Sequence, residues 1–458
     1  MRKSTDDFVW DLSCSATNRR PTRSQRLLSG EVGHLPPNRG LAVRSFATNV
    51  ARALRQFSVS LSVVLLSSVV TSCSNGIGDK NNGIIPHSLF GMTVLNSQHV
   101  APPLSYGTTR TWDSFPMLDW AEINSSAGVY HFQDLDAFIQ LSQERGAEVI
   151  YTFGRTPRWA SSKPDAVGPY GPGQCAPPAD LRNWDDYVTA IASHAGVRIS
   201  YWELWNEPQD SDFYCGDVQT MVTMAQHAYR IIKSINPAAQ ILTPTCTASG
   251  GPPWLDSYLS EGGGNYADIM SFHGYWNTEA ESINAVVSRY QKVLAAHGQS
   301  SKPLWDTEGS WAGDPAKALQ GSGNRAAFLA KYYLLQWSDG VSRFIWYAYD
   351  GGYWGGFSDP VNGTAPEVAS YNLVQQWMVG GSMISSCASD SSGTWSCTLG
   401  RSGGYRALVL WNSTRTVTYQ VPEQYTDLRD LFGDLQSLSE SSVEVGNSPV
   451  LVETGTAF

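Results

Sequence analysis

The stretch ISYWELWNEP, residues 199–208, has the pattern of a buried strand that ends on a carboxylate. Its aromatic and β-branched side chains favour a strand, and Asn206, Glu207 and Pro208 end it abruptly. A buried strand end is a costly place for a charge, so Glu207 is a candidate functional group. The alternative is that Glu207 only favours the first turn of a following helix.

Strand-like segments recur along the chain, and helical patterns lie between most of them. The predicted strands span 89–95, 106–112, 147–154, 199–205, 239–245, 268–276, 302–309 and 343–350. Two of the helical patterns stop at Gly146 and Gly298, which are typical helix ends. Eight strands that alternate with helices predict a parallel sheet, and eight is the number that closes a (β/α)8 barrel. The first connection is short, so the helices are less well defined than the strands.

The pattern changes near residue 380. Short alternating strands and turns occupy 380–458, which predicts a small antiparallel β-sandwich domain. The predicted organisation is therefore an N-terminal extension with a signal segment over 1–73, a linker over 74–84, a barrel over 85–379 and this accessory domain.

The N-terminal region has the features of an export signal. Two arginines precede an apolar run over about 57–70, which is too short to span a membrane as a helix. The sequence VTSC at 70–73 resembles a bacterial lipobox and implies a lipid on Cys73, with an ordinary secretory signal as the alternative. Residues 1–50 are polar, and a signal would not begin so far into the chain, so we expect translation to start near Val50. We expect an exported protein of the bacterial cell envelope, periplasm or medium.

Composition limits the classes of partner. The formal net charge is −10, with 31 Lys and Arg against 41 Asp and Glu, which argues against nucleic acid or an anionic membrane surface as the main partner. The 458 residues are 42% hydrophobic and can bury a large core. The 17 Trp and 21 Tyr can pack such a core or stack on the flat faces of sugars. The oligomeric state stays open.

The cysteine positions predict two disulfides. Cys387 and Cys397 flank a turn rich in Ser and Gly, and Cys175 and Cys215 each follow a predicted strand. An exported protein can hold such bridges, which leaves Cys246 as a buried thiol. No Cys pair has zinc-finger spacing and no HExxH motif occurs, so we expect no metal site.

Two carboxylates fall at the ends of facing strands, where barrel enzymes hold their catalytic groups. Glu207 ends the fourth predicted strand and Glu308 ends the seventh. Two carboxylates about 5 Å apart at a sugar make a retaining glycosidase, which needs no metal or organic cofactor. Trp205 and Pro208 favour a protonated Glu207, and Arg110 at the end of the second strand is a candidate donor to the other carboxylate.

The motif WNEP at 205–208, with a Glu at the end of strand seven, resembles glycoside hydrolase clan A. The segment from RTWDSFPML to RTPRWAS, residues 110–161, is similar to family 39 of that clan. This family includes β-xylosidases, α-L-iduronidases and exopolysaccharide hydrolases, and the resemblance extends over about 85–380. Gly309 follows the strand-seven Glu where the xylosidases usually carry a larger residue, so the resemblance is closer to the exopolysaccharide type.

The resemblance implies a role for each matched residue. It implies that Glu207 is the acid/base, that Glu308 is the nucleophile, and that Asn206 bonds the sugar 2-hydroxyl. It implies that His273 and Tyr275 line the sugar subsite and touch the nucleophile.

Further substrate contacts are expected around these groups. The resemblance implies that Trp346 is the stacking floor beneath the sugar and that Arg110 belongs to the site. Asp113, Trp159 and Trp276 lie near the barrel mouth and are candidates for sugar contact. Packing or capping of loops is the alternative for each of the three.

Two further acids are expected to play supporting roles. Glu203 precedes Glu207 by four residues, and Asp306 precedes Glu308 by two. Strand alternation places each on the same face as its candidate but deeper in the barrel.

The predicted function is a retaining glycoside hydrolase that cleaves O-glycosidic bonds in an oligo- or polysaccharide by double displacement, and we expect these bonds to be β-linked. One alternative is a transglycosylase on the same site, and another is a carbohydrate-binding surface lipoprotein without catalysis. A serine hydrolase is disfavoured because no GxSxG motif occurs. The sugar, the linkage and exo against endo action stay open.

Overall fold

The computed structural model describes residues 83–275, 278–311 and 319–455. The N-terminal extension, the export signal with Cys73, most of the predicted linker and Trp276 lie outside these residues. Within the described ranges, no helix is both long enough and apolar enough to cross a membrane.

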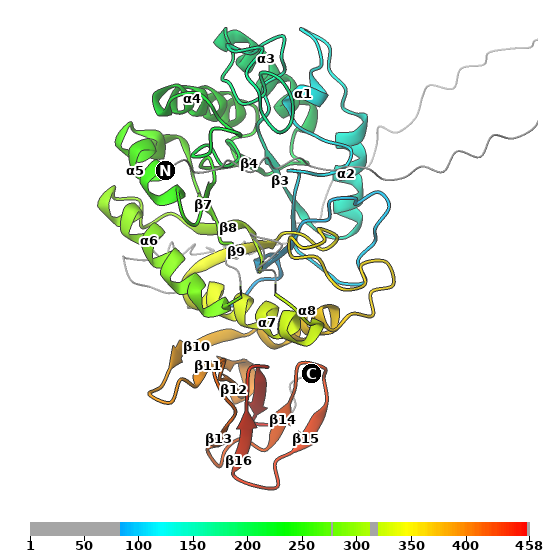
Figure 1. Cartoon of the computed structure of the whole chain (residues 1–458), viewed down its shortest axis with the longest axis vertical. Coiled ribbons are helices and arrows are strands. Elements are labelled where there is room, and N and C mark those ends of the chain that lie inside the picture. The colour runs from blue at the N-terminus through cyan, green and yellow to red at the C-terminus, as the bar shows by residue number, and fades with distance from the viewer. Residues whose placement is uncertain (1–82, 276–277, 312–318, 456–458) are drawn as a thin grey trace, which may run out of the picture. The chain divides into compact units, whose positions relative to one another are not determined.

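A parallel sheet of nine strands forms the barrel (Figure 1). Its order is β5-β4-β3-β2-β1-β9-β8-β7-β6, and each neighbouring pair within it is parallel. The bounds are β1 Phe90–Met92, β2 Thr108–Arg110, β3 Glu148–Thr152, β4 Tyr201–Glu203, β5 Gln240–Leu242, β6 Cys246–Thr247, β7 Met270–His273, β8 Leu304–Gly309 and β9 Val341–Trp346. The sheet and its helices confirm the predicted (β/α)8 barrel.

Strand β5 lies within the fifth predicted strand, 239–245, and β6 begins directly after its end. Pro244 lies between them and has no N–H to donate to a ladder. A parallel bridge from Leu242 to Ile269 joins β5 to the start of β7 and closes the barrel, while Asn206 pairs with Thr245. The nine strands therefore correspond to eight positions around the barrel.

Helices follow the strands and surround the sheet in Figure 1. They are α1 Trp120–Ile123, α2 Gln133–Glu144, α3 Leu181–Ala195, α4 Val218–Ile235, α5 Gly251–Ser260, α6 Ile283–Ala296, α7 Ser322–Ser338 and α8 Pro366–Met378, with short 3-10 turns η1 His87–Leu89, η2 Gly263–Tyr266 and η3 Ala280–Ser282. The side chains of Asp180 and Asp217 cap α3 and α4 by accepting from backbone N–H groups. The described residues hold no α-helix between β1 and β2, as the short first connection suggests.

The C-terminal strands confirm the predicted β-sandwich. A six-stranded antiparallel sheet has the order β10-β11-β12-β17-β14-β15, and a two-stranded sheet pairs β13 with β16. The bounds are β10 Ser382–Ser389, β11 Trp395–Gly400, β12 Arg406–Trp411, β13 Val417–Gln420, β14 Asp427–Arg429, β15 Leu435–Ser437, β16 Ser442–Val445 and β17 Val450–Glu453, with the 3-10 turn η5 at Ser402–Gly404. Leu410, Val443 and Val452 belong to the apolar cluster between the two sheets.

The barrel interior is apolar toward the N-terminal ends of the strands and polar toward their C-terminal ends. Five buried side chains from different strands form its apolar cluster: Ile150, Leu242, Ile269, Trp305 and Ile345. The next inward positions of β3, β4 and β8 carry Thr152, Glu203 and Thr307, which are joined by hydrogen bonds. The polar layer lies toward the C-terminal strand ends, so the functional groups gather there.

The structure joins the cysteines in the two predicted pairs. Cys175 bonds to Cys215, which links the loop after β3 to the loop after β4. Cys387 bonds to Cys397 across the β10–β11 hairpin, and Cys246 is a buried free thiol.

Candidate active site

The two predicted glutamates face each other at the barrel mouth. An oxygen of Glu207, a ring nitrogen of His273 and an oxygen of Glu308 all lie within 4.8 Å of one another. Glu207 follows β4 with a left-handed φ of 44°, a conformation that costs energy outside glycine. The carboxylate spacing is close to that of retaining glycosidases and shorter than that of inverting ones.

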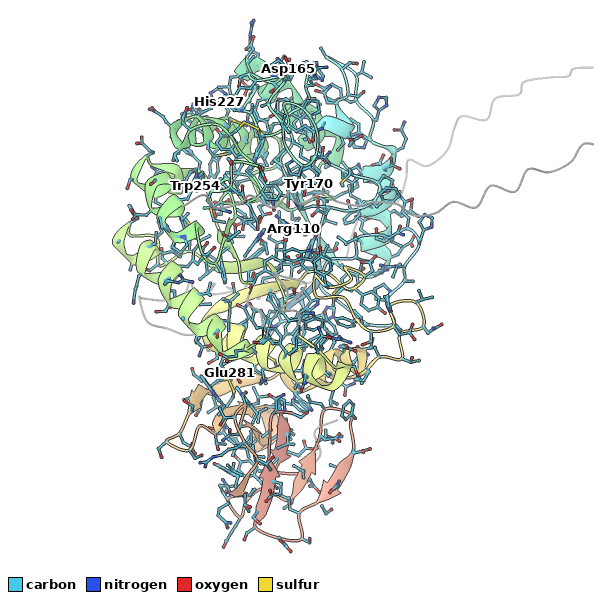
Figure 2. All side chains as sticks on the ribbon, viewed as in Figure 1. Arg110, Asp165, Tyr170, His227, Trp254 and Glu281 are labelled. Carbon is cyan, nitrogen blue, oxygen red and sulfur yellow. A yellow bond between two sulfur atoms is a disulfide. The ribbon has the colours of Figure 1, made fainter. Side chains whose placement is uncertain are left out.

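Arg110, labelled in Figure 2 within the ring of helices, connects three residues of the site through its guanidinium. Its Nε donates to Glu203 at 2.7 Å, its Nη1 to Glu308 Oε2 at 2.6 Å, and its Nη2 to Asn206 Oδ1 at 2.7 Å. Burial lowers the pKa of Arg110, but the two glutamates raise it more, so the guanidinium stays charged. Arg110 therefore fixes the position of Glu308, the candidate nucleophile. It also fixes Asn206, which precedes Glu207, the candidate acid.

Glu308 is surrounded by donors. Tyr275 donates to Oε1 at 2.6 Å, while Arg110 holds Oε2. Burial and the nearby Glu207 raise the pKa of Glu308, while Arg110 and the Tyr275 hydroxyl oppose this rise. A carboxylate that accepts such hydrogen bonds is stabilised in its ionised form, which a nucleophile requires.

Burial also dominates the electrostatics of Glu207. Burial raises its pKa to about 8, although Arg110 opposes the shift. Its Oε1 lies 2.7 Å from His273 Nδ1. Burial also lowers the pKa of His273 to about 4, so the imidazole is neutral near pH 7. Glu207 therefore holds a proton at neutral pH, as a general acid must.

Glu203 takes the supporting place that strand alternation predicts. It accepts hydrogen bonds from Thr152 at 2.8 Å and from Thr307 at 2.7 Å, besides the one from Arg110. Glu203 is fully buried within the polar layer of the barrel, and its negative charge balances the positive charge of Arg110.

The placement predicted for Asp306 is wrong. The pairing register of β8 shifts between Asp306 and Gly309, so Asp306 and Glu308 do not share a face. Asp306 accepts from the backbone N–H of Gly274 at 3.0 Å and from the side chain of Gln336 on α7. Thr307 takes the inward position instead, and Asp306 supports the strand from the helix side.

The predicted role of Trp346 is also wrong. Its side chain is wholly buried, its ring centroid lies 4.8 Å from that of Trp311, and its Nε1 donates to Gly355 O at 2.9 Å. The next residue, Tyr347, reaches the site and donates to Asp113 Oδ2 at 2.7 Å. Ile345 points into the barrel, so alternation turns Trp346 outward to the helices and Tyr347 inward.

Trp346→Ala is expected to lower the free energy of unfolding by about 3–5 kcal/mol, because a large core side chain is lost. The matched variant Tyr347→Phe is expected to cost about 1 kcal/mol or less, because it removes one hydroxyl at the rim of the core. Denaturant unfolding of both variants measures this difference. Equal losses would contradict the assignment of Trp346 to the core and Tyr347 to the site.

The remaining candidates divide between the site and its surroundings. Asp113, with φ 57°, accepts from Tyr170 at 2.8 Å as well as from Tyr347. Trp159 is 36% exposed and lines a cleft of about 560 Å³ with Pro157 and Pro164. Its Nε1 donates to the backbone of the loop after α1, so the structure places it apart from the contact network of the glutamates. Trp276 lies outside the described residues.

Sequence reasoning missed two residues of the site, Tyr170 and Tyr347. Tyr170 lies in the long loop after β3, where no periodic pattern fixes a side-chain direction. Tyr347 was detectable, since it continues the inward positions 343 and 345 of β9.

The groups Glu207, His273 and Glu308 have a spacing that suits a metal ion. Arg110 nevertheless lies 2.6 Å from Glu308 Oε2, and a second cation beside a buried guanidinium is unfavourable. The donor set is thus better suited to proton transfer than to metal binding.

Comparison with known proteins agrees with this geometry. The family model described as glycosyl hydrolases family 39 matches residues 118–302. A β-xylosidase from Caldicellulosiruptor saccharolyticus is 23% identical over 154 residues, which are 32% of this chain and 31% of that protein. The chain thus spans about a third of the length of this curated relative. Glu207 and His273 lie inside the matched range of the family model, whereas Arg110 and Glu308 lie outside it.

Solved structures share the fold over most of the chain. A family 39 β-xylosidase from Caulobacter crescentus superposes with a TM-score of 0.61 at 16% identity and covers 82% of this chain and 98% of its own. A family 39 glycoside hydrolase from Bacteroides cellulosilyticus WH2 gives 0.60 at 18% identity, with 76% and 75% covered. At such identities the likeness establishes the fold. Together with the family match, it confirms the predicted resemblance of the chain to the family 39 glycosyl hydrolases.

Proposed function

We propose that the protein is a retaining glycoside hydrolase that cleaves β-linked glycosides by double displacement. The observation that carries the proposal is the pair Glu207 and Glu308, whose oxygens lie within 4.8 Å and whose surroundings differ. Burial favours the protonated form of Glu207, while Arg110 and Tyr275 stabilise the charge on Glu308. One acid and one nucleophile at this spacing are the requirements for retention.

The reaction proceeds in two balanced steps. In the first, Glu207 gives its proton to the glycosidic oxygen while an oxygen of Glu308 attacks the anomeric carbon, so the leaving sugar departs as an alcohol. In the second, the ionised Glu207 takes a proton from water, whose oxygen attacks the same carbon and releases Glu308. Arg110 holds the oxygen of the Asn206 amide, so the amide nitrogen is the group that can donate to the 2-hydroxyl.

β-Xylosides are the first substrates to test, because two of the similar proteins are named β-xylosidases. A panel of 4-nitrophenyl β- and α-glycosides, followed by plant and bacterial polysaccharides, tests the proposal with the full chain. Release of free sugar supports hydrolysis, whereas products longer than the substrate would instead support transfer to a second sugar. Binding without turnover across the panel would contradict the proposal.

The pH profile follows from the two carboxyl groups. Glu207 acts as an acid only while protonated, and its pKa is about 8, so kcat/KM for an alkyl glycoside is expected to fall as pH rises through about 8. Glu308 acts as a nucleophile only while ionised, and burial raises its pKa. The loss of activity on the acid side is therefore expected at a higher pH than the usual pKa of a glutamate. Glu207→Gln is the matched control and should lose the alkaline limb. A wild-type alkaline limb that persists in this variant would contradict the assignment.

We further propose that the protein acts outside the cytoplasm. The signal pattern before Cys73 supports export, and disulfides such as the Cys175–Cys215 pair form in oxidising compartments. Labelling of intact cells with a membrane-impermeant reagent tests this, and protein found only in the cytoplasm would contradict it.

A further inference from the structure

The cleft that Trp159 lines is formed by α1 and the loop that follows β3. Its volume of about 560 Å³ is within the range of sites that bind small molecules. The described residues that line it include neither Glu207 nor Glu308. Asp165, one of the lining residues, is labelled in Figure 2 at one end of the barrel, whereas Arg110 lies near its centre. The cleft is therefore separate from the catalytic pair, and we call it the Trp159 cleft.

Trp159 presents an oriented aromatic surface to this cleft. Its indole Nε1 donates to the backbone oxygen of Asn124 at 2.9 Å, which satisfies the one polar atom of the side chain. The residue is nevertheless 36% exposed. An indole whose N–H is already bonded presents mainly apolar surface to solvent. Such a surface is suited to stack on the flat apolar face of a sugar ring.

The loop that carries Trp159 is held in one shape by its own hydrogen bonds. The N–H of Ser162 donates to Pro177 O at 2.9 Å, and the hydroxyl of Ser161 donates to Gly173 O at 2.7 Å. The disulfide of Cys175 ties the same loop to the loop after β4. A preformed cleft loses less conformational entropy when a ligand binds.

The polar groups of the cleft include both donors and acceptors. Arg158 donates to Asp165 Oδ1 at 2.6 Å, yet the two side chains are 64% and 80% exposed, so both can also bond to a ligand. The carboxylate of Glu122 is exposed as well. Gln174 Oε1 accepts from Arg155 at 2.9 Å, which leaves the amide nitrogen of Gln174 as a donor. Sugar hydroxyls both donate and accept, so this mixed set suits them.

The charges around the cleft favour an uncharged ligand. Two acids, Glu122 and Asp165, line it with one base, Arg158. Arg155 contacts the cleft through Gln174, but its charge is balanced by the ion pair with Asp119. The whole chain has a net charge of −10, which also disfavours an acidic polymer. A neutral sugar chain is therefore a better match than one that carries carboxylates.

We propose that the Trp159 cleft is a second carbohydrate-binding site, which holds a neutral polysaccharide by stacking one of its sugar rings on Trp159. The inference goes beyond the proposed hydrolase function, because binding in the cleft requires no catalysis. Arg155 joins the two regions, since it bonds to Gln174 and its guanidinium lies 4.5 Å from the centre of the Tyr170 ring. Tyr170 in turn donates to Asp113, so the cleft and the surroundings of the catalytic pair share one loop.

Affinity electrophoresis of the full chain tests the proposal. A Glu308→Gln background prevents cleavage of the ligand, so the result stays readable even if the proposed hydrolase function fails. The gels contain arabinoxylan, mixed-linkage β-glucan or galactomannan as neutral polymers, and polygalacturonate or alginate as acidic ones. We expect at least one neutral polymer to retard the protein and the acidic polymers not to. No retardation by any neutral polymer, or stronger retardation by an acidic one, would overturn the proposal.

Substitutions of Trp159 in this background locate the binding. Trp159→Ala is expected to raise the Kd for the best neutral polymer by about tenfold, because the stacking surface is lost. Trp159→Phe keeps an aromatic face and is expected to lose less. Circular dichroism establishes that both variants are folded. A folded Trp159→Ala protein that binds as tightly as its parent would overturn the proposal, and equal losses in the two variants would contradict stacking on the ring.

Two further variants serve as a second probe and a control. Asp165→Ala changes an exposed side chain of the same cleft and is expected to raise the Kd by about threefold. It decides the test if Trp159→Ala does not fold, and unchanged binding would then overturn the proposal. Phe432→Ala is the matched control, since it removes a 55% exposed aromatic side chain from the β-sandwich domain and should leave the Kd unchanged. A loss in Phe432→Ala equal to that in Trp159→Ala would place the binding outside the cleft.

Discussion

Glu308→Ala is expected to lower kcat by roughly 10⁴-fold or more on every substrate, because no other group can form the covalent intermediate. The fold should persist, since Arg110 keeps its hydrogen bonds to Glu203 and Asn206 when Glu308 is removed. Steady-state kinetics on the best aryl glycoside and a thermal melt of the same preparation measure both effects.

Glu308→Gln is the matched control for this variant. It preserves the shape of the side chain and lacks the nucleophilic charge, so its activity should fall as far as that of Glu308→Ala. A folded variant of either kind that retains wild-type turnover would remove Glu308 from the mechanism.

Glu207→Ala is expected to depend strongly on the leaving group. Glycosides with poor leaving groups should lose about 10²- to 10⁴-fold in kcat/KM, because they require the proton that Glu207 supplies. Aryl glycosides with good leaving groups need little protonation and should still form the glycosyl ester on Glu308, which then accumulates. Azide should enter the space left by the carboxyl group and restore turnover.

The product of that rescue distinguishes the roles of the two glutamates. Azide attack on the ester should give a glycosyl azide with the configuration of the substrate, which mass spectrometry and NMR identify. Equal losses on all substrates, together with no effect of azide, would contradict the acid/base role of Glu207.

The sequence predicted the barrel and its two glutamates for a physical reason. Strands buried on both faces leave runs rich in apolar and aromatic residues such as 199–205, and the Asn-Glu-Pro that ends this run stands out. Glu207 lies where that reasoning places it, and Arg110 meets Glu308 as the order of the strand ends implies. The pairing of Cys175 with Cys215 follows from the same placement, since each cysteine lies in a loop after neighbouring strands.

The predictions that failed depended on side-chain direction. Asp306 was assigned by strict alternation, and the register shift in β8 turns it toward α7. A shift of this kind leaves no periodic signal in a run of six residues. Trp346 was assigned from the family resemblance, although the alternation of β9 pointed to Tyr347. Tyr170 had no periodic signal because its position depends on long-range contacts to Asp113 and Arg155.

The anomeric configuration of the first-formed sugar tests the central claim most directly. The best aryl glycoside is mixed with the full chain in deuterated buffer, and the anomeric proton is followed by NMR before mutarotation equilibrates the product. The account predicts that the product first appears with the configuration of the substrate, because Glu207 and Glu308 lie within 4.8 Å and one forms an ester with the sugar. A first product of inverted configuration would contradict the account, since it requires water between carboxylates that lie further apart.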